Sequence, residues 1–341
     1  MPLDERMLST YERELLDRAS DWRDHVNLAE LTVDELRVVA EREGIEFATA
    51  LLYQRVCTSG QHGPFIQAID DLLDDTGPIG DAPFKLAIVP GAFYQEFPAS
   101  GADGRLVREA ASPLEIDVEM IPVQSFGSIK SNAEIIVNWL QEHDLGPTVL
   151  ISLSKGGSDI KLALDRPDAG QAFRDVIAWV NLSGILYGTP LVSWVLRWKL
   201  RTWWFRCLLG MRGYDFGVVR ELDCTADSPL HKTLTLPAGM RAIHVVGFPL
   251  RDHLTNSLAR RWYRRIRHCG PNDGAGILLG NLTRTPGQVY PLWGADHYLR
   301  PRGRDPIQMA RAILRYLAQT METAECDNAT NTIPPSLERC R

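Results

Sequence analysis

Short apolar runs alternate with helical stretches along most of the sequence, and this alternation constrains the fold more than any other feature. The apolar runs span residues 85–89, 116–123, 147–153, 176–182, 241–248 and 287–292. Helical stretches are predicted between most of them, at 132–143, 159–164, 256–267 and 307–321. Strands that alternate with helices favour a mostly parallel sheet with helices on both faces. The sequence therefore predicts an α/β domain over residues 84–320.

The two ends of the chain have a different character. Residues 1–80 are expected to form a helical N-terminal extension, because apolar side chains recur there every three or four positions, at Met7, Tyr11, Leu15, Ala19 and Trp22. Within this extension, short helices are predicted at 46–57 and 65–75, and a capping box at Thr32 and Glu35. Residues 322–341 are polar and are predicted to form a flexible tail.

Composition narrows the class of protein. Hydrophobic residues make up 45% and charged residues 23%, which is typical of a soluble globular chain. The net charge of −6 gives no reason to expect nucleic acid as a partner. The six cysteines are scattered without metal-binding spacing, and no GxGxxG or P-loop string is present, so neither a metal nor an organic cofactor is expected. The start lacks the pattern of a signal peptide, which favours free thiols and a cytoplasmic location.

The string Ser152-Leu153-Ser154-Lys155-Gly156 carries the most chemical information. It lies between an apolar strand and a predicted helix. A nucleophile on such a turn has a strained backbone, so the residues two before and two after it must be small. Ser152 and Gly156 meet that requirement. The following helix directs its positive end at Ser154, which favours a developing negative charge. The alternative is a glycine-rich turn in which Ser154 only caps the helix.

This string resembles the nucleophile elbow of the α/β-hydrolase superfamily, Gly-x-Ser-x-Gly, with Ser152 in place of the first glycine. The resemblance implies that Ser154 is a nucleophile, followed along the chain by an acid and a histidine. Asp252 follows the strand at 241–248, and His297 follows the last strand, so these two are the predicted acid and base. Asp252 is alternatively only a helix N-cap, and His297 a surface histidine. Asp296 is a less suitable acid because sequence neighbours usually point apart.

The resemblance also implies an oxyanion hole made by two backbone N–H groups. One is that of Lys155, directly after the serine. The other is expected in the turn after the strand at 85–89, where Ala92 is the first choice and Phe93 the alternative.

Residues 184–240 interrupt the alternation at the place where α/β-hydrolases commonly carry a cap or lid. The first part of this insertion holds four tryptophans and several basic residues, and no acidic residue occurs from 184 to 214. Its apolar runs are too short to span a bilayer. Three interpretations stay open: the tryptophans pack the cap onto the core, line an acyl pocket, or make transient contact with a membrane surface.

Together these features predict a serine hydrolase, esterase-like or lipase-like, that cleaves a carboxylic ester of a hydrophobic acyl substrate. The expected partner is a small-molecule or lipid-like ester. Two alternatives remain: transfer of the acyl group to another acceptor or cleavage of a thioester by the same residues, and a binding or scaffolding protein that has the fold without turnover. The oligomeric state is open.

Overall fold

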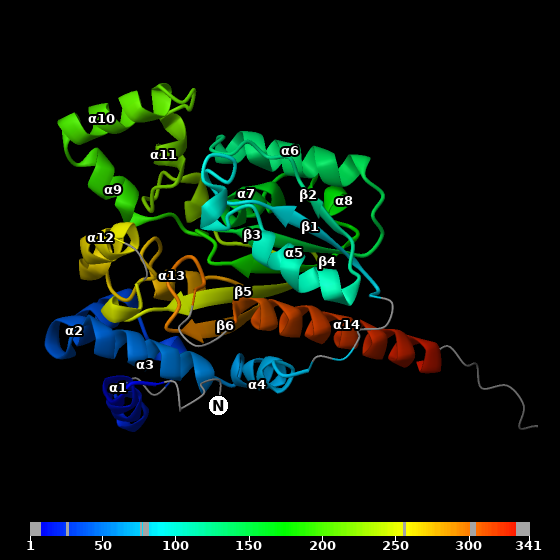
Figure 1. Ribbon diagram of the computed structural model, residues 1–341, viewed down its shortest axis with the longest axis horizontal. Helices are drawn as coiled ribbons and strands as arrows, with labels where there is room; N and C mark the ends of the chain where they lie inside the picture. The colour runs from blue at the N-terminus through cyan, green and yellow to red at the C-terminus, as the bar shows by residue number, and fades with distance from the viewer. Residues whose placement is uncertain are drawn as a thin grey trace, which may run out of the picture.

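The computed structural model describes residues 8–24, 27–75, 77, 82–254, 257–300 and 305–331. Six parallel strands form one sheet in the order β2-β1-β3-β4-β5-β6 (Figure 1). The strands are β1 (Lys85–Val89), β2 (Val118–Met120), β3 (Thr148–Leu153), β4 (Val176–Leu182), β5 (Arg241–Phe248) and β6 (Gln288–Trp293). The predicted α/β fold class is confirmed, and all six apolar runs form strands.

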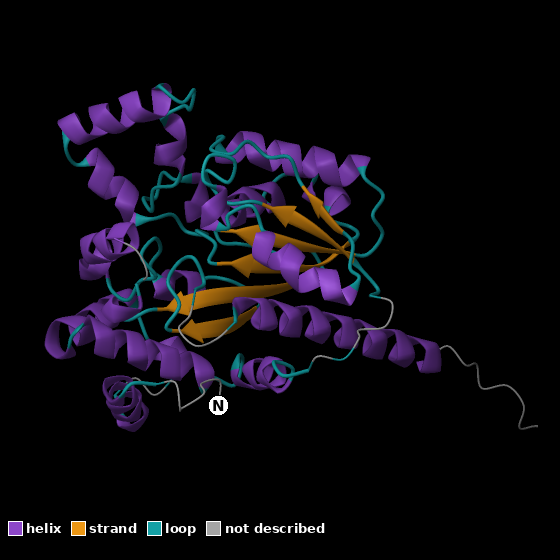
Figure 2. Cartoon of the chain, in the orientation of Figure 1, coloured by secondary structure: helices purple, strands orange, loops and turns teal. Residues whose placement is uncertain are grey.

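Helices cover both faces of the sheet, as Figure 2 shows. Successive residues of a strand point to opposite faces, and both faces of the strands are buried. Leu86 and Ile88 belong to a core cluster shared with α5 (Arg105–Ala111) and α14 (Pro306–Asn331). Ala87 and Val89 belong to a second cluster, shared with α6 (Ile129–Glu142), α7 (Lys155–Leu164) and α8 (Ala169–Ala172). Burial on both sides explains why the strands read as continuous apolar runs.

The last helix is longer than predicted. Helix α14 ends at Asn331, so the structure corrects the prediction of a tail from residue 322 as far as residue 331. The rest of that predicted tail, residues 332–341, lies outside the described residues.

The N-terminal extension packs against one end of the sheet. It contains α1 (Thr10–Asp21), α2 (Val33–Glu43), α3 (Ile45–Cys57) and α4 (Gly63–Asp71). Helices α3 and α4 lie against β5 and β6, and α1 and α2 pack on α3 (Figure 1). Thr32 and Glu35 form the predicted capping box. Tyr53 packs edge-on against Phe248 of β5 and also contacts Trp293 of β6. The extension therefore shares the core of the sheet.

Side chains of the extension also reach the backbone of β6, which is an edge strand. The Gln61 side chain donates to the carbonyl of Gly287 at 3.0 Å, and the N–H of Val289 donates to Nδ1 of His62 at 3.3 Å. Tyr290 donates its hydroxyl to Asp70 at 2.8 Å. The contacts of Gln61 and His62 cover backbone groups that an edge strand otherwise leaves open.

The insertion between β4 and β5 contains α9 (Pro190–Leu196), α10 (Lys199–Gly210) and α11 (Gly217–Glu221). Figure 1 shows it on the side of the sheet toward which the strands point their carboxyl ends. Two further helices, α12 (Ser257–Ile266) and α13 (Leu278–Thr283), lie between β5 and β6. Short 3₁₀ helices are η2 (Leu28–Glu30), η3 (Pro98–Ser100), η4 (Ser112–Leu114), η5 (Pro229–His231), η6 (Arg251–His253) and η7 (Arg267–Cys269). Across the described residues, the helices are all too short or too polar to cross a bilayer.

Candidate active site

Ser154 is the single residue between strand β3 and helix α7. Its backbone has φ 48° and ψ −115°, which is unfavourable for a residue with a side chain. The turn is also very tight, because a Cβ at Gly156 would lie 2.5 Å from the carbonyl oxygen of Val89. Ser154 is partly exposed. The bend therefore holds the hydroxyl out of the sheet, where another molecule can reach it.

The structure brings Ser154 and His297 together, although they are 143 residues apart. Oγ of Ser154 lies 2.8 Å from Nε2 of His297. The histidine follows β6 after a turn at Gly294, so both side chains lie at the carboxyl edge of the parallel sheet. This distance fits a hydrogen bond between a nucleophile and its base.

The carboxylate on His297 is Asp273, which the sequence analysis missed. Oδ2 of Asp273 lies 2.9 Å from Nδ1 of His297. Oδ1 accepts the backbone N–H groups of Ala275 at 2.8 Å and Gly276 at 2.7 Å. The backbone N–H of His297 in turn donates to the carbonyl of Asp273 at 2.9 Å. The carboxylate is buried, and each of its oxygens is held in place.

The prediction of Asp252 as the acid is wrong. Asp252 is exposed in the short helix η6, where the chain turns from β5 toward the N-terminal extension. The N–H of Arg251 donates to Glu46 at 3.0 Å, and His253 pairs with Glu12 at 2.8 Å. Asp273 already occupies the place of the acid, because its carboxylate lies within hydrogen-bonding distance of Nδ1 of His297.

Asp296 does not take this place either, since both ring nitrogens of His297 are engaged, Nε2 by Ser154 and Nδ1 by Asp273. Oδ1 of Asp296 accepts the N–H of Tyr298 at 3.0 Å. The signal that points to Asp273 is its loop, Gly270-Pro-Asn-Asp-Gly-Ala-Gly276. Small residues after an aspartate leave backbone N–H groups free to turn back onto its carboxylate.

The two ionisable groups stabilise each other's charged forms. Burial lowers the pKa of His297, but the Asp273 carboxylate outweighs this effect and raises that pKa above its usual value. Burial raises the pKa of Asp273, but His297 and the N–H groups of Gly276 and Ala275 lower it below its usual range. The site therefore favours a carboxylate next to an imidazolium, which is the charge state that forms when the histidine takes a proton from serine.

The turn after β1 lies against Ser154. A Cβ at Gly91 would lie 3.4 Å from Cβ of Ser154. The N–H of Phe93 donates to the carbonyl of Ser125 at 2.9 Å, so the structure argues against Phe93 as an oxyanion donor. Lys155 is the first residue of α7, and the N–H of a first helical residue has no helical acceptor. Ala92 and Lys155 remain the predicted oxyanion donors.

Ser152, which replaces the usual glycine of the elbow, has a hydrogen-bonding role. Its buried hydroxyl donates to Oδ1 of Asn181 at 2.9 Å and accepts from Nε1 of Trp179 at 2.8 Å. Nδ2 of Asn181 lies 3.1 Å from Nδ1 of His244, whose Nε2 lies 3.0 Å from the carbonyl of Pro286. Burial lowers the pKa of His244 to about 4. A line of neutral polar groups thus crosses β3, β4 and β5 behind the serine.

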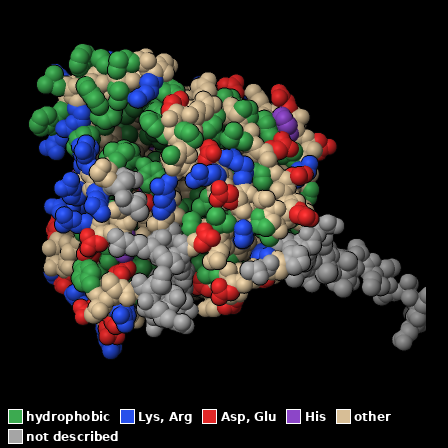
Figure 3. Space-filling view, viewed as in Figure 1, with side chains coloured by type: hydrophobic (Ala, Val, Ile, Leu, Met, Phe, Trp, Pro, Cys, Tyr) green, Lys and Arg blue, Asp and Glu red, His purple; other side chains and the backbone are tan. Residues whose placement is uncertain are grey.

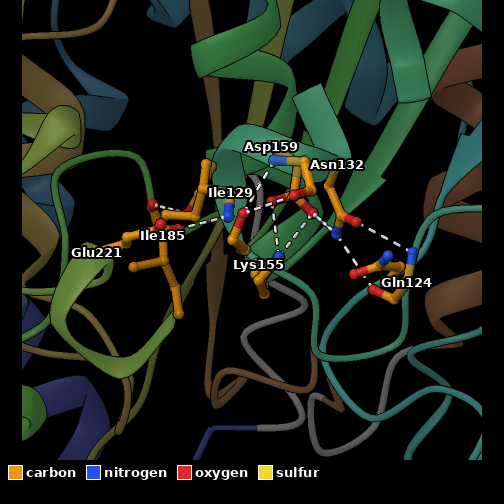
Figure 4. A network of polar contacts seen from close by, with 10 residues as sticks. Gln124, Ile129, Asn132, Lys155, Asp159, Ile185 and Glu221 are labelled. Atoms are coloured by element: carbon orange, nitrogen blue, oxygen red, sulfur yellow. Dashed lines mark hydrogen bonds and ion pairs between the residues drawn. The ribbon is translucent and has the colours of Figure 1, made fainter. Parts of the chain in front are cut away.

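The side chain of Lys155 forms a buried ion pair with Asp159 (Figure 4). Its Nζ lies 2.7 Å from Oδ1 of Asp159, one helical turn later. Asn132 of α6 donates to the same carboxylate at 2.9 Å and accepts the N–H of Gln124 at 3.0 Å. This network fixes the first turn of α7, and with it the backbone N–H of Lys155.

An apolar wall adjoins the turn after β1. Phe93 stacks on Phe126 with ring centroids 4.3 Å apart, and Tyr214 of the cap meets both rings edge-on. The same cluster includes buried cap residues and the partly buried Ala92, with Val192, Val195, Leu209 and Phe216 among its members. The cap therefore presents apolar side chains beside the predicted oxyanion donor.

The four cap tryptophans divide into two groups. Trp194 lies between two guanidinium groups, those of Arg201 and Arg265, each 3.6 Å from its ring centroid. Trp198, Trp203 and Trp204 are exposed, so packing of the cap onto the core does not account for them.

The surface has two sizeable cavities, and neither is lined by Ser154 or His297. One of about 520 Å³ is bordered by Tyr187, Trp194, Cys224, Cys269 and Ile277. The other, of about 940 Å³, lies between the N-terminal extension and α12 and is rich in arginine. Among the described residues, no group of three His, Cys, Asp or Glu side chains is placed to hold a metal ion.

The sheet order, the cap position and the strained serine define an α/β-hydrolase fold. A metagenomic carboxyl esterase, MGS0156, has 19% identity and a TM-score of 0.54, over 71% of this chain and 78% of that one. The mature lipase BlEst2 of Bacillus licheniformis has 17% identity and a TM-score of 0.48, over 72% of this chain and 94% of that one. Neither a protein-family model nor a curated protein matches the sequence.

Proposed function

We propose that the protein hydrolyses a carboxylic ester through an acyl-serine intermediate. The observation that carries this proposal is the 2.8 Å contact between Oγ of Ser154 and Nε2 of His297. The second contact, from Nδ1 of His297 to Asp273, fixes the tautomer in which Nε2 is free to accept a proton. The fold shared with a carboxyl esterase is consistent with this chemistry.

The reaction divides into two steps on the same residues. Oγ of Ser154 attacks the ester carbonyl carbon while its proton passes to Nε2 of His297. The N–H groups of Ala92 and Lys155 stabilise the resulting oxyanion. When the carbon–oxygen bond breaks, His297 gives the proton to the departing alcohol. Water then attacks the acyl-serine with His297 again as the base, which releases the acid and restores the serine.

The apolar wall favours a hydrophobic acyl group. Phe93, Phe126 and Tyr214 lie beside the predicted oxyanion donor, where the acyl part of an ester must lie when its carbonyl oxygen points at Ala92. A lipid-like ester fits this surface better than a charged one. p-Nitrophenyl esters of rising chain length test the preference, and equal kcat/KM for acetyl and longer acyl chains contradicts it.

Labelling with a fluorophosphonate probe tests the nucleophile. The parent protein is expected to label, Ser154→Ala to lose labelling, and Ser131→Ala, a matched change on α6, to label like the parent. Labelling of Ser154→Ala at the parental level would remove the serine-hydrolase proposal. A folded parent that does not label favours a binding or scaffolding protein. Added alcohol or thiol acceptors distinguish hydrolysis from acyl transfer by the products they yield.

A further inference from the structure

Helix α10 carries apolar side chains on the face that points to solvent. Leu200, Trp203 and Trp204 of α10, and Met211 directly after its last residue, are 80%, 63%, 54% and 78% exposed. Their spacing of three, four and seven or more residues places them on one stripe of the helix. The opposite stripe contains the buried Leu209. A surface helix normally turns its polar face to solvent and its apolar face to the core. The exposed apolar stripe of α10 is therefore suited to contact with an apolar environment outside the chain.

The residues around the stripe are basic. Arg197, Lys199, Arg206 and Arg212 are exposed on or beside α10, and no acidic residue occurs from 184 to 214. Exposed aromatic side chains bordered by lysine and arginine are the combination that binds at the boundary between lipid headgroups and acyl chains. Another protein surface would need an acidic rim, whereas an anionic bilayer supplies negative charge around any point of insertion.

Helix α12 extends this basic surface and is joined to the cap. Arg265 of α12 stacks on Trp194 of α9 at 3.6 Å, which connects the two elements. Arg261 and Arg264 are exposed, and within the described residues neither forms an ion pair. Glu43 and Glu46 line the arginine-rich cavity together with Arg261 and Arg264. Glu43 forms an ion pair with Arg18, and Glu46 accepts a hydrogen bond from Tyr11. Within the described part of the chain, neither carboxylate forms an ion pair with Arg261 or Arg264.

The apolar stripe of α10 and the arginines of α12 lie on one side of the molecule. Figure 3 shows hydrophobic side chains over α10 and a band of lysine and arginine directly below them, toward α12. The strands point their carboxyl ends, and so Ser154, toward this same side (Figure 1).

We propose that the protein docks on anionic lipid bilayers through the exposed stripe of α10, with the arginines of α12 against the headgroups. This surface includes none of the residues assigned to catalysis, so it can be tested whether or not the ester hydrolase proposal holds. Docking in this orientation brings the carboxyl edge of the sheet near the lipid, where hydrophobic esters concentrate.

Sedimentation of the full chain with vesicles tests the proposal. Vesicles of equal parts phosphatidylcholine and phosphatidylglycerol are expected to bind the parent at least about tenfold more tightly than pure phosphatidylcholine, with affinity falling as salt rises. Trp203→Ser with Trp204→Ser should lower binding about tenfold or more, because two interfacial aromatic side chains are lost. Arg261→Gln with Arg264→Gln should lower it at least about fivefold.

Matched variants elsewhere on the surface serve as controls. Val38→Ser, at a 56% exposed apolar position on α2, and Arg105→Gln, on α5, should bind vesicles like the parent. All variants should retain the parental turnover of a water-soluble short-chain ester.

Three results would overturn the proposal. One is a parent that does not sediment with the anionic vesicles. Another is a tryptophan variant that binds as the parent does. The third is a parent that self-associates in sedimentation velocity, becomes monomeric on loss of Trp203 and Trp204, and leaves vesicles unbound, which would make the stripe an interface between copies of this chain.

Discussion

Replacement of Asp273 by asparagine tests whether the carboxylate that contacts His297, and not the predicted Asp252, is the acid of the proposed reaction. Oδ1 of Asp273 accepts two backbone N–H groups, from Ala275 and Gly276. In Asp273→Asn the amide oxygen must stay at that position, because an NH₂ group there would face two donors. The NH₂ group then faces Nδ1 of His297 and donates to it. This fixes the tautomer with its proton on Nε2, which cannot accept a proton from Ser154.

The size of the effect follows from this wrong tautomer. Loss of a triad carboxylate with the geometry preserved lowers kcat by about 10⁴, or about 5 kcal/mol of transition-state stabilisation. The pH profile adds a second readout. Because the Asp273 carboxylate raises the pKa of His297, the acid limb of kcat/KM in the parent should lie above the usual histidine value. In Asp273→Asn burial dominates, so the residual activity should have its acid limb at lower pH.

The assay is hydrolysis of a soluble p-nitrophenyl ester across pH, with Asp252→Asn as the matched control. Asp252 is exposed in η6, so its variant should keep kcat within about twofold of the parent. Thermal unfolding of both variants checks that they are folded. If Asp252→Asn loses activity while a folded Asp273→Asn keeps more than about a tenth of it, the assignment of the acid is refuted.

Three further predictions concern the frame of the site. Ser152→Gly restores the usual elbow residue but removes the partner of Trp179 and Asn181, so it should lower the free energy of unfolding in urea by about 1–3 kcal/mol, and an unchanged midpoint would contradict this. Gly156→Ala places a Cβ 2.5 Å from the carbonyl of Val89 and should lower the free energy of unfolding by about 1–3 kcal/mol, together with most of the proposed ester hydrolysis; a parental Tm would count against the tight turn. His244 has a pKa of about 4 in the folded chain and the usual value of 6.5 in the unfolded chain. Between pH 6.5 and pH 4 the unfolded chain therefore binds a proton that the folded chain does not, and the free energy of unfolding should fall by at most about 3 kcal/mol as the pH drops through this range. His244→Gln should flatten this dependence, and an equal slope in both proteins would show that His244 is not its source.

The sheet and two of the three site side chains were predictable because they depend on local pattern. Apolar runs specify the strands, and the carboxyl ends of parallel strands meet at one edge, which places Ser154 and His297 together. Ser152 was predicted only as a small residue that the turn tolerates. Its hydroxyl forms hydrogen bonds with Trp179 and Asn181 on the neighbouring strand. These contacts depend on how the two strands pair, which the local sequence around Ser152 does not indicate.

The acid was not predictable from strand order alone. The chain leaves β5 toward Glu46 and Glu12 of the N-terminal extension, and these contacts turn Asp252 away from the site. It returns only after α12 and η7, where the loop at 270–276 carries Asp273 to His297. The path of the chain between β5 and Asp273 depends on long-range contacts with helices of the extension, and no sequence spacing predicts such contacts. The exposed stripe of α10 was likewise visible only once the inner face of that helix was known.

The contacts of Gln61 and His62 with β6 have a consequence for any shortened form of this protein. A chain that starts at residue 82 would keep Ser154, Asp273 and His297, yet it would present the bare backbone of its outermost strand to other molecules. Uncovered strands of this kind recruit one another into stacked, insoluble assemblies. The N-terminal extension therefore protects the edge strand from pairing with other copies of the chain. A form without it is expected to aggregate even though the three site residues are still present.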